Sequence, residues 1–226
     1  MRMKKLRVLA VVVFVACGSS PKRAPVSRAE LTSSALSAVV VIRAGTDEIN
    51  GFASESEGFV VDASGLIATS LHGIEGESNL RVVLHDAATE YPVTAVTGVD
   101  PARDLALVRI AAKGPLPAVR LGDSNAIAAG ARVHAIGHEG LIDGTIREVR
   151  ALSPALTILQ VQVPNPKSWD GPVFDEYGDV VGLTTNYITL PSSVLAVPVN
   201  YIKRLMANQV ALAPDEFAKQ TAKPTP

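Results

Sequence analysis

The sequence has a single cysteine, few aromatic residues and almost no net charge, and each scarcity excludes something. With Cys17 as the only cysteine among 226 residues, no intramolecular disulfide can form, so burial of apolar surface must stabilise the fold. Lys plus Arg number 21 and Asp plus Glu number 22, so a net charge of −1 gives no electrostatic reason to expect a nucleic-acid partner. Aromatic residues make up 4% and hydrophobic residues 47%, which predicts an aliphatic core.

The N-terminus also lacks an apolar run of the roughly 20 residues needed to cross a membrane as a helix. Basic residues precede nine unbroken apolar residues, Val8–Ala16, which is the pattern of a secretory signal peptide. Phe14–Cys17 resembles a bacterial lipobox, in which the cysteine is lipidated. We therefore expect an exported protein, held at the periplasmic face of the outer membrane only through a lipid on Cys17. The alternative is an ordinary signal peptide that is cut nearby, with Cys17 incidental.

From about residue 36 the chain consists of short β-branched runs separated by Gly, Asp, Asn and Pro. This pattern predicts an all-β barrel or sandwich. The turn residues Asp62–Gly65 predict a hairpin between two such runs. Pro198–Ala207 predicts an amphipathic helix, and the residues after Asn208 are mostly polar and predict a frayed tail.

Three local features could carry chemistry. His72 follows an apolar run, Asp104 precedes another, and the loop Asn165–Pro172 lies between two predicted strands. Taken singly, His72 could be only a strand-end residue and Asp104 only a turn residue. Together they follow the chain order of chymotrypsin-type serine hydrolases, in which a histidine takes the proton of the nucleophile and an aspartate holds the imidazole.

The histidines do not predict a metal site. Only His134 and His138 are four positions apart, and in a strand this spacing separates them by about 13 Å. We expect neither a metal ion nor another cofactor.

The span from about Ala38 to Met206 resembles the protease domain of the HtrA-like (Deg-type) serine proteases. The matching segments are Ser56–Val61 (the family's Gly-Ser-Gly-Phe strand, with Ser56 at its first glycine), Thr69–His72, Val99–Val108, Leu121–Ser124, Ala135–His138 and Leu195–Pro198. The resemblance implies a trypsin-like double β-barrel, with two six-stranded antiparallel barrels and a C-terminal helix. It also implies that His72 is the general base, that Asp104 orients it, and that the partner is a polypeptide substrate or client.

The resemblance also sets the expected domain boundaries. We predict a lipoprotein signal peptide at 1–16, a tether at 17–35, the protease-fold domain at 36–208 with barrels at about 36–115 and 116–208, and a polar tail at 209–226. The PDZ module common in the family is not expected. The uncharged segments Leu183–Asn186 and Val194–Ala196 are expected to line the specificity pocket, as they do in the family.

The chain departs from the family in the middle of its nucleophile loop. The family loop reads Asn-Pro-Gly-Asn-Ser-Gly-Gly-Pro, whereas this chain reads Asn-Pro-Lys-Ser-Trp-Asp-Gly-Pro. Lys167 therefore stands at the oxyanion-hole glycine and Trp169 at the nucleophilic serine. An indole offers only an N–H donor, so Trp169 cannot attack a peptide bond, and a side chain at 167 restricts a backbone that must direct N–H groups at one oxygen.

These departures favour an inactive protein that keeps the fold in order to bind peptides or proteins. The alternative is an active serine endopeptidase in which Ser168, with the loop shifted by one residue, acts with His72 and Asp104. A holdase chaperone of the cell envelope is a third possibility.

Overall fold

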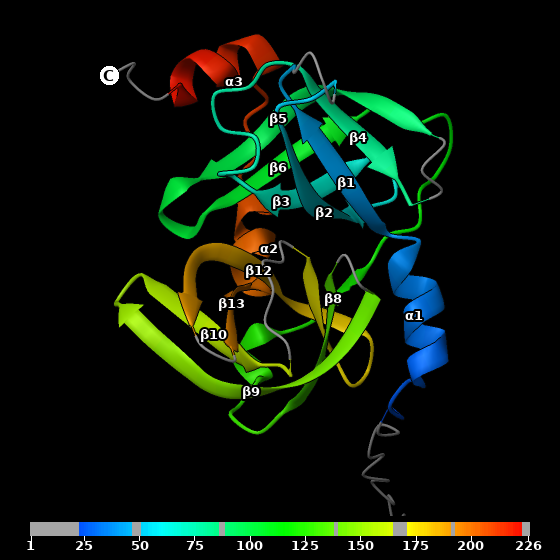
Figure 1. The fold of residues 1–226 in the computed structure, drawn as a ribbon, viewed down its shortest axis with the longest axis vertical. Helices are drawn as coiled ribbons and strands as arrows, with labels where there is room; N and C mark the ends of the chain where they lie inside the picture. The colour runs from blue at the N-terminus through cyan, green and yellow to red at the C-terminus, as the bar shows by residue number, and fades with distance from the viewer. Residues whose placement is uncertain are drawn as a thin grey trace, which may run out of the picture.

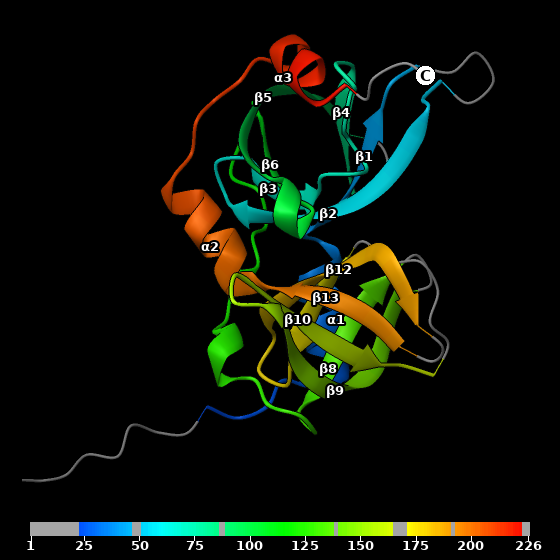
Figure 2. The same ribbon diagram turned by 90° about the vertical axis from the view of Figure 1, so that its left-hand side faces the viewer.

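The computed structural model describes residues 23–46, 51–85, 89–137, 140–164, 171–190 and 193–222. Two β-barrels lie one above the other, and helix α2 (Val199–Ala207) runs along one side of both (Figures 1 and 2). The predicted fold class, a trypsin-like double β-barrel with a C-terminal helix, is confirmed.

The N-terminal barrel contains six antiparallel strands in the closed order β1-β2-β3-β6-β5-β4. The strands are β1 (Val39–Ala44), β2 (Ser54–Asp62), β3 (Leu66–Ser70), β4 (Leu80–Leu84), β5 (Glu90–Asp100) and β6 (Leu105–Ile110). The predicted hairpin is β2–β3, and its turn requires Gly65, which has φ +95°. The barrel interior is aliphatic, as the composition predicted, apart from Phe217, which is fully buried there.

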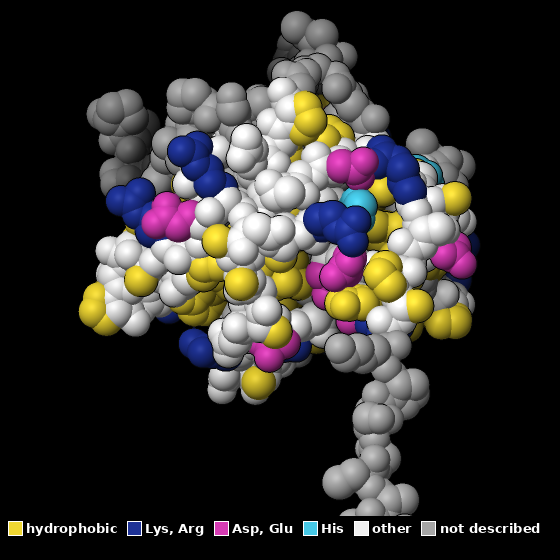
Figure 3. Space-filling view, turned by 90° about the horizontal axis from the view of Figure 1, so that it is seen from below, with side chains coloured by type: hydrophobic (Ala, Val, Ile, Leu, Met, Phe, Trp, Pro, Cys, Tyr) yellow, Lys and Arg dark blue, Asp and Glu magenta, His cyan; other side chains and the backbone are white. Residues whose placement is uncertain are grey.

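The C-terminal barrel is closed by pairing between β11 and β12, and the short β7 adds to β12 in parallel. Its strands are β7 (Arg120–Leu121), β8 (Arg132–Gly137), β9 (Gly140–Ser153), β10 (Leu156–Gln162), β11 (Pro172–Asp175), β12 (Asp179–Leu190) and β13 (Ser193–Pro198). Seen from below, basic and acidic side chains lie next to one another on the molecule (Figure 3).

An apolar cluster that is separate from the interior of each barrel joins the two barrels. Phe59 of the first barrel and Phe174 of the second are both fully buried in it, together with Ile202 of α2. Helix α2 approaches the first barrel so closely that a Cβ on Gly98 would lie 2.8 Å from Leu205 Cγ. Burial of this shared cluster fixes the relative position of the barrels, which matters because the candidate site draws on both.

The two ends of the chain differ from the expected tether and polar tail. Helix α1 (Arg28–Leu36) begins with a capping box between Ser27 and Glu30 and buries Leu31 and Ala35. Helix α3 (Pro214–Thr221) buries Phe217. Both helices are mostly polar. Each docks through only one or two apolar side chains, and so few do not form a recognisable sequence pattern. Within the described part of the chain, no helix is long and apolar enough to cross a membrane.

Candidate active site

Two neighbouring strands bring His72 and Asp104 together. His72 follows β3 and Asp104 precedes β6, and these strands pair with Ser70 opposite Leu105. The Nδ1 atom of His72 lies 2.7 Å from Oδ2 of Asp104, and the backbone N–H of His72 donates to Oδ1 at 2.8 Å. The carboxylate therefore fixes both the ring and the backbone of His72.

A third contact to the carboxylate comes from the other barrel. The Oγ1 hydroxyl of Thr185, on β12, donates to Oδ2 of Asp104 at 2.8 Å. The sequence predicted Thr185 only as part of the specificity pocket, and this hydrogen bond was missed. No local signal could have revealed it, because the two residues are 81 positions apart and meet only where the barrels pack together.

The surroundings of Asp104 keep it ionised. Its side chain is only 8% exposed, and burial by itself raises the pKa of a carboxyl group. Hydrogen bonds from His72 and Thr185 outweigh that effect and hold the pKa of Asp104 below its ordinary value. Since an ionised carboxylate accepts the Nδ1–H of His72, the Nε2 atom is the nitrogen that can take up a proton.

The backbone at Asp104 is also unusual. Asp104 ends a short 3-10 helix, η1 (Pro101–Arg103), with φ 55° and ψ 42°. It is the one non-glycine residue with positive φ in the part of the chain that the structure describes. The left-handed conformation costs about 1–2 kcal/mol for a residue with a side chain, and the hydrogen bonds to the carboxylate help to offset it.

The loop that would supply the nucleophile lies outside the described residues, which stop at Pro164 and resume at Gly171. The predictions for Lys167, Ser168 and Trp169 therefore stay predictions. Gly171 itself has a structural reason to be glycine, because a Cβ there would lie 2.1 Å from the carbonyl oxygen of Ile136. Its own carbonyl accepts hydrogen bonds from the N–H and hydroxyl of Thr184 at 2.9 and 3.0 Å. Closure of the barrel thus fixes this end of the loop.

A carboxylate also lies at the edge of this loop. Oε2 of Glu57, on β2, is buried, and it lies 2.8 Å from where a Cβ on Gly171 would be. The resembling family has serine at this place in its Gly-Ser-Gly-Phe strand. The structure thus places an acidic side chain beside the described end of the loop.

An apolar cavity of about 280 Å³ adjoins the pair on the side of the second barrel. Asp104 and Thr185 form one wall, and the other lining residues are Pro101, Ala102, Arg103, Leu152, Leu156, Ile158, Leu195 and Val197. The structure thus brings Thr185 and Leu195, one from each segment expected at the specificity pocket, to a single apolar space beside His72–Asp104.

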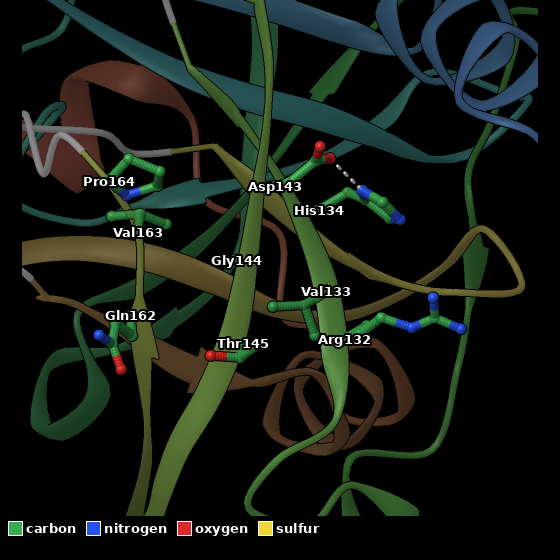
Figure 4. A pocket seen from close by; sticks show the side chains of 9 residues that line it. All are labelled: Arg132, Val133, His134, Asp143, Gly144, Thr145, Gln162, Val163 and Pro164. Atoms are coloured by element: carbon green, nitrogen blue, oxygen red, sulfur yellow. Dashed lines mark hydrogen bonds and ion pairs between the residues drawn. The ribbon is translucent and has the colours of Figure 1, made fainter.

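The other histidines lie elsewhere. His134 on β8 pairs with Asp143 on β9, with 2.8 Å between Nδ1 and Oδ1, and both line a pocket of about 580 Å³ across β8, β9 and β10 (Figure 4). His85 follows β4, and His138 is outside the described residues. Among the residues that are described, no group of three or more His, Cys, Asp or Glu side chains is placed to hold a metal ion.

Comparison with known proteins gives the same family as the geometry. The family model for the trypsin-like peptidase domain matches residues 56–183, which span both barrels and include His72, Asp104 and the nucleophile loop. Serine protease HTRA1 of Xenopus laevis is 30% identical over 168 residues, which is 69% of this chain and 36% of that protein. A probable periplasmic serine endoprotease DegP-like of Marinomonas sp. is 32% identical over 154 residues, 64% of this chain and 32% of that protein.

One relative is named as an anti-sigma factor and not as a protease. The anti-sigma-I factor RsgI9 of Acetivibrio thermocellus is 27% identical over 168 residues, 72% of this chain and 24% of that protein. The chain thus spans about a third or less of the length of these relatives. With the double barrel, the histidine–aspartate pair and the family match over more than half its length, the chain belongs to the trypsin-like peptidase domain family, in its HtrA-like branch.

Proposed function

We propose that this protein is an exported, lipid-anchored pseudoprotease, which binds peptides or proteins in the cleft of its HtrA-like domain without cleaving them. The observation that carries the proposal is Trp169 at the position of the nucleophilic serine. An indole cannot form an acyl-enzyme, so the chemistry of the family cannot proceed through this residue.

The substitutions expected at the oxyanion hole support the proposal further. Each hydrogen-bond donor of an oxyanion hole contributes about 3 kcal/mol to transition-state stabilisation in measured cases. Lys167 replaces a glycine of that hole, and its side chain restricts a backbone that must direct N–H groups at one oxygen. Catalysis is thus opposed at the oxyanion hole as well as at the nucleophile position.

Gly171 matches the family loop, but this match is compatible with an inactive protein. Its close approach to Ile136 requires a glycine for folding alone. A binding role is further supported by the apolar cavity beside Asp104, which could accept an apolar side chain of a bound polypeptide. A relative named as an anti-sigma factor is consistent with this domain serving in proteins that are not named as proteases.

One observation favours the alternative, an active endopeptidase. His72, Asp104 and Thr185 form a complete, pre-organised base, with both carboxylate oxygens engaged. In that reaction Ser168 Oγ would attack the scissile carbonyl while Nε2 of His72 takes its proton, and Asp104 would stabilise the imidazolium. The alternative requires Ser168 to reach His72 through a one-residue shift of the loop.

A fluorophosphonate probe separates the two functions, because it labels only an activated serine. The wild-type chain, Ser168→Ala and the control Ser33→Ala, which alters an exposed serine of α1, are compared for labelling and for cleavage of an unfolded protein. We expect neither labelling nor cleavage in any of them. Labelling that is lost in Ser168→Ala and kept in Ser33→Ala would establish the protease and overturn the pseudoprotease.

The binding role and the anchor need their own measurements. Fluorescence anisotropy of labelled unfolded polypeptides should show saturable binding that an apolar-to-charged change, Leu195→Glu, weakens. The anchor is tested by Cys17→Ser, which should move the protein from the membrane to the soluble fraction. Unchanged fractionation would refute the lipid anchor, and suppression of client aggregation by the intact protein would extend the binding role to a holdase.

A further inference from the structure

A further pocket, of about 610 Å³, is bounded by helix α2, the 3-10 helix η2 (Ser124–Ala126) and the β9–β10 hairpin. Its volume is in the range of about 300–1,000 Å³ that is typical of small-molecule sites. Its lining residues include Arg103, Ser124, Ile127, Val149, Tyr201 and Arg204. Two of the lining residues are arginines, and none carries a negative charge.

The two arginines share one aromatic ring. The guanidinium carbons of Arg103 and Arg204 lie 4.2 and 5.4 Å from the centroid of the Tyr201 ring. The ring is held in place, since the Tyr201 hydroxyl donates to Ala155 O at 3.2 Å and accepts from Thr157 N–H at 2.9 Å. Two cations are therefore gathered on a fixed platform at the wall of the pocket.

Only one of these two charges is balanced. Arg103 pairs with Asp100 at 2.6 Å and donates to Ala155 O at 2.5 Å. Arg204 is exposed and, within the described residues, its guanidinium has no ion pair or hydrogen bond. The N–H groups of this guanidinium are thus available to an outside acceptor, and their fork geometry suits a carboxylate or phosphate.

Neutral donors and apolar walls complete the pocket. Ser124 is only 5% exposed, and its hydroxyl oxygen accepts from Asn200 N–H at 3.2 Å, while its proton goes to no acceptor in the described chain. Ile127 and Val149 provide an apolar surface next to these polar groups. A site with two cations, a hydroxyl donor and an apolar wall is matched by an anion carried on an apolar body.

We propose that this pocket binds a small organic anion, with its carboxylate or phosphate group on Arg204 and its apolar part against Ile127 and Val149. This goes beyond the proposed peptide-binding function, since the pocket shares only Arg103 with the lining of the cavity beside Asp104. Arg103 directly precedes Asp104, so an occupant of the pocket contacts the same loop that positions the carboxylate of the candidate active site.

Phenyl phosphate is a suitable probe, followed by isothermal titration into the intact protein at low salt. Arg204→Gln should weaken binding by at least about tenfold, the effect of losing one charge-assisted contact. The matched control is Lys203→Gln, which removes the same charge from the neighbouring position of α2 but does not line the pocket. Circular dichroism verifies that both variants fold. Equal affinity of the two variants would overturn the proposal.

Two competitors test the chemistry of the ligand. Inorganic phosphate should displace phenyl phosphate, because the charged group makes the contact with Arg204. Phenol, which has the same apolar body without the charge, should bind at least about tenfold more weakly. Phenol binding as tightly as phenyl phosphate, or a failure of phosphate to compete, would show that the pocket does not select anions and would refute the assignment.

Discussion

The two parts of the candidate active site, the histidine–aspartate pair and the nucleophile loop, differ in how closely they follow the family. At His72, Asp104 and Thr185 every hydrogen bond needed to hold a general base is present, across both barrels. At the loop, residues 167–170 read Lys-Ser-Trp-Asp where the resembling family has Gly-Asn-Ser-Gly. The difference shows that the histidine–aspartate pair also serves the fold, because it ties β3, β6 and β12 together. Such a pair can persist without a nucleophile.

The largest effect is expected when the family residues are restored in the loop. The variant Lys167→Gly, Ser168→Asn, Trp169→Ser, Asp170→Gly should gain cleavage of an unfolded protein by about a thousandfold or more, since nucleophile and oxyanion hole return to a base that is already placed. Hydrolysis of a fluorescently labelled casein measures the gain.

The control for this gain is the same variant with His72→Ala, which should have no activity. A folded, restored variant that still cannot cleave would contradict the view that the loss of activity is confined to the loop.

The second prediction concerns the structural role of the loop's end. Gly171→Ala should lower the free energy of unfolding by about 3 kcal/mol or prevent folding, because its Cβ would meet the carbonyl oxygen of Ile136 at 2.1 Å. Urea denaturation measures the effect. Gly114→Ala is the matched control and should be nearly neutral, since a Cβ there would have no atom beyond its chain neighbours within 4 Å.

The third prediction concerns the contact between the barrels. Thr185→Val removes the hydroxyl that donates to Asp104 and should lower the free energy of unfolding by about 1–3 kcal/mol, as expected for a hydrogen bond to a charged group. Thr185→Ser keeps the donor and should lose less. Equal losses in the two variants would mean that packing of the threonine, and not its hydrogen bond, is what matters.

The smallest effect is expected in how the free energy of unfolding declines as the pH falls. Because the pKa of folded Asp104 is held below that of the unfolded chain, its contribution is complete above the unfolded pKa and is lost as the pH falls through the folded pKa. Thr185→Val removes one of the groups that lower this pKa, so its stability should decline less steeply on acidification. Urea unfolding between about pH 6 and pH 2 tests this, and parallel curves for the two proteins would contradict it.

The sequence was sufficient for the parts that depend on local patterns. Short β-branched runs with turn residues between them predicted the strands, and the apolar stripe of residues 198–207 predicted α2. It was not sufficient for α1 and α3, where only Leu31, Ala35 and Phe217 are buried within otherwise polar segments. Docking of so few side chains depends on a partner surface that a local pattern does not contain.

The order of the family's motifs and the departure from the family loop at residues 167–170 are properties of the linear chain, so the sequence alone was enough to reveal both. Only the tertiary structure brought Thr185 to Asp104, Glu57 to Gly171, and Arg103 to the ring of Tyr201. Each of these contacts joins segments far apart in the chain. Their geometry is set by the packing of the two barrels and α2 around a shared apolar cluster, and this packing is decided by the whole fold at once.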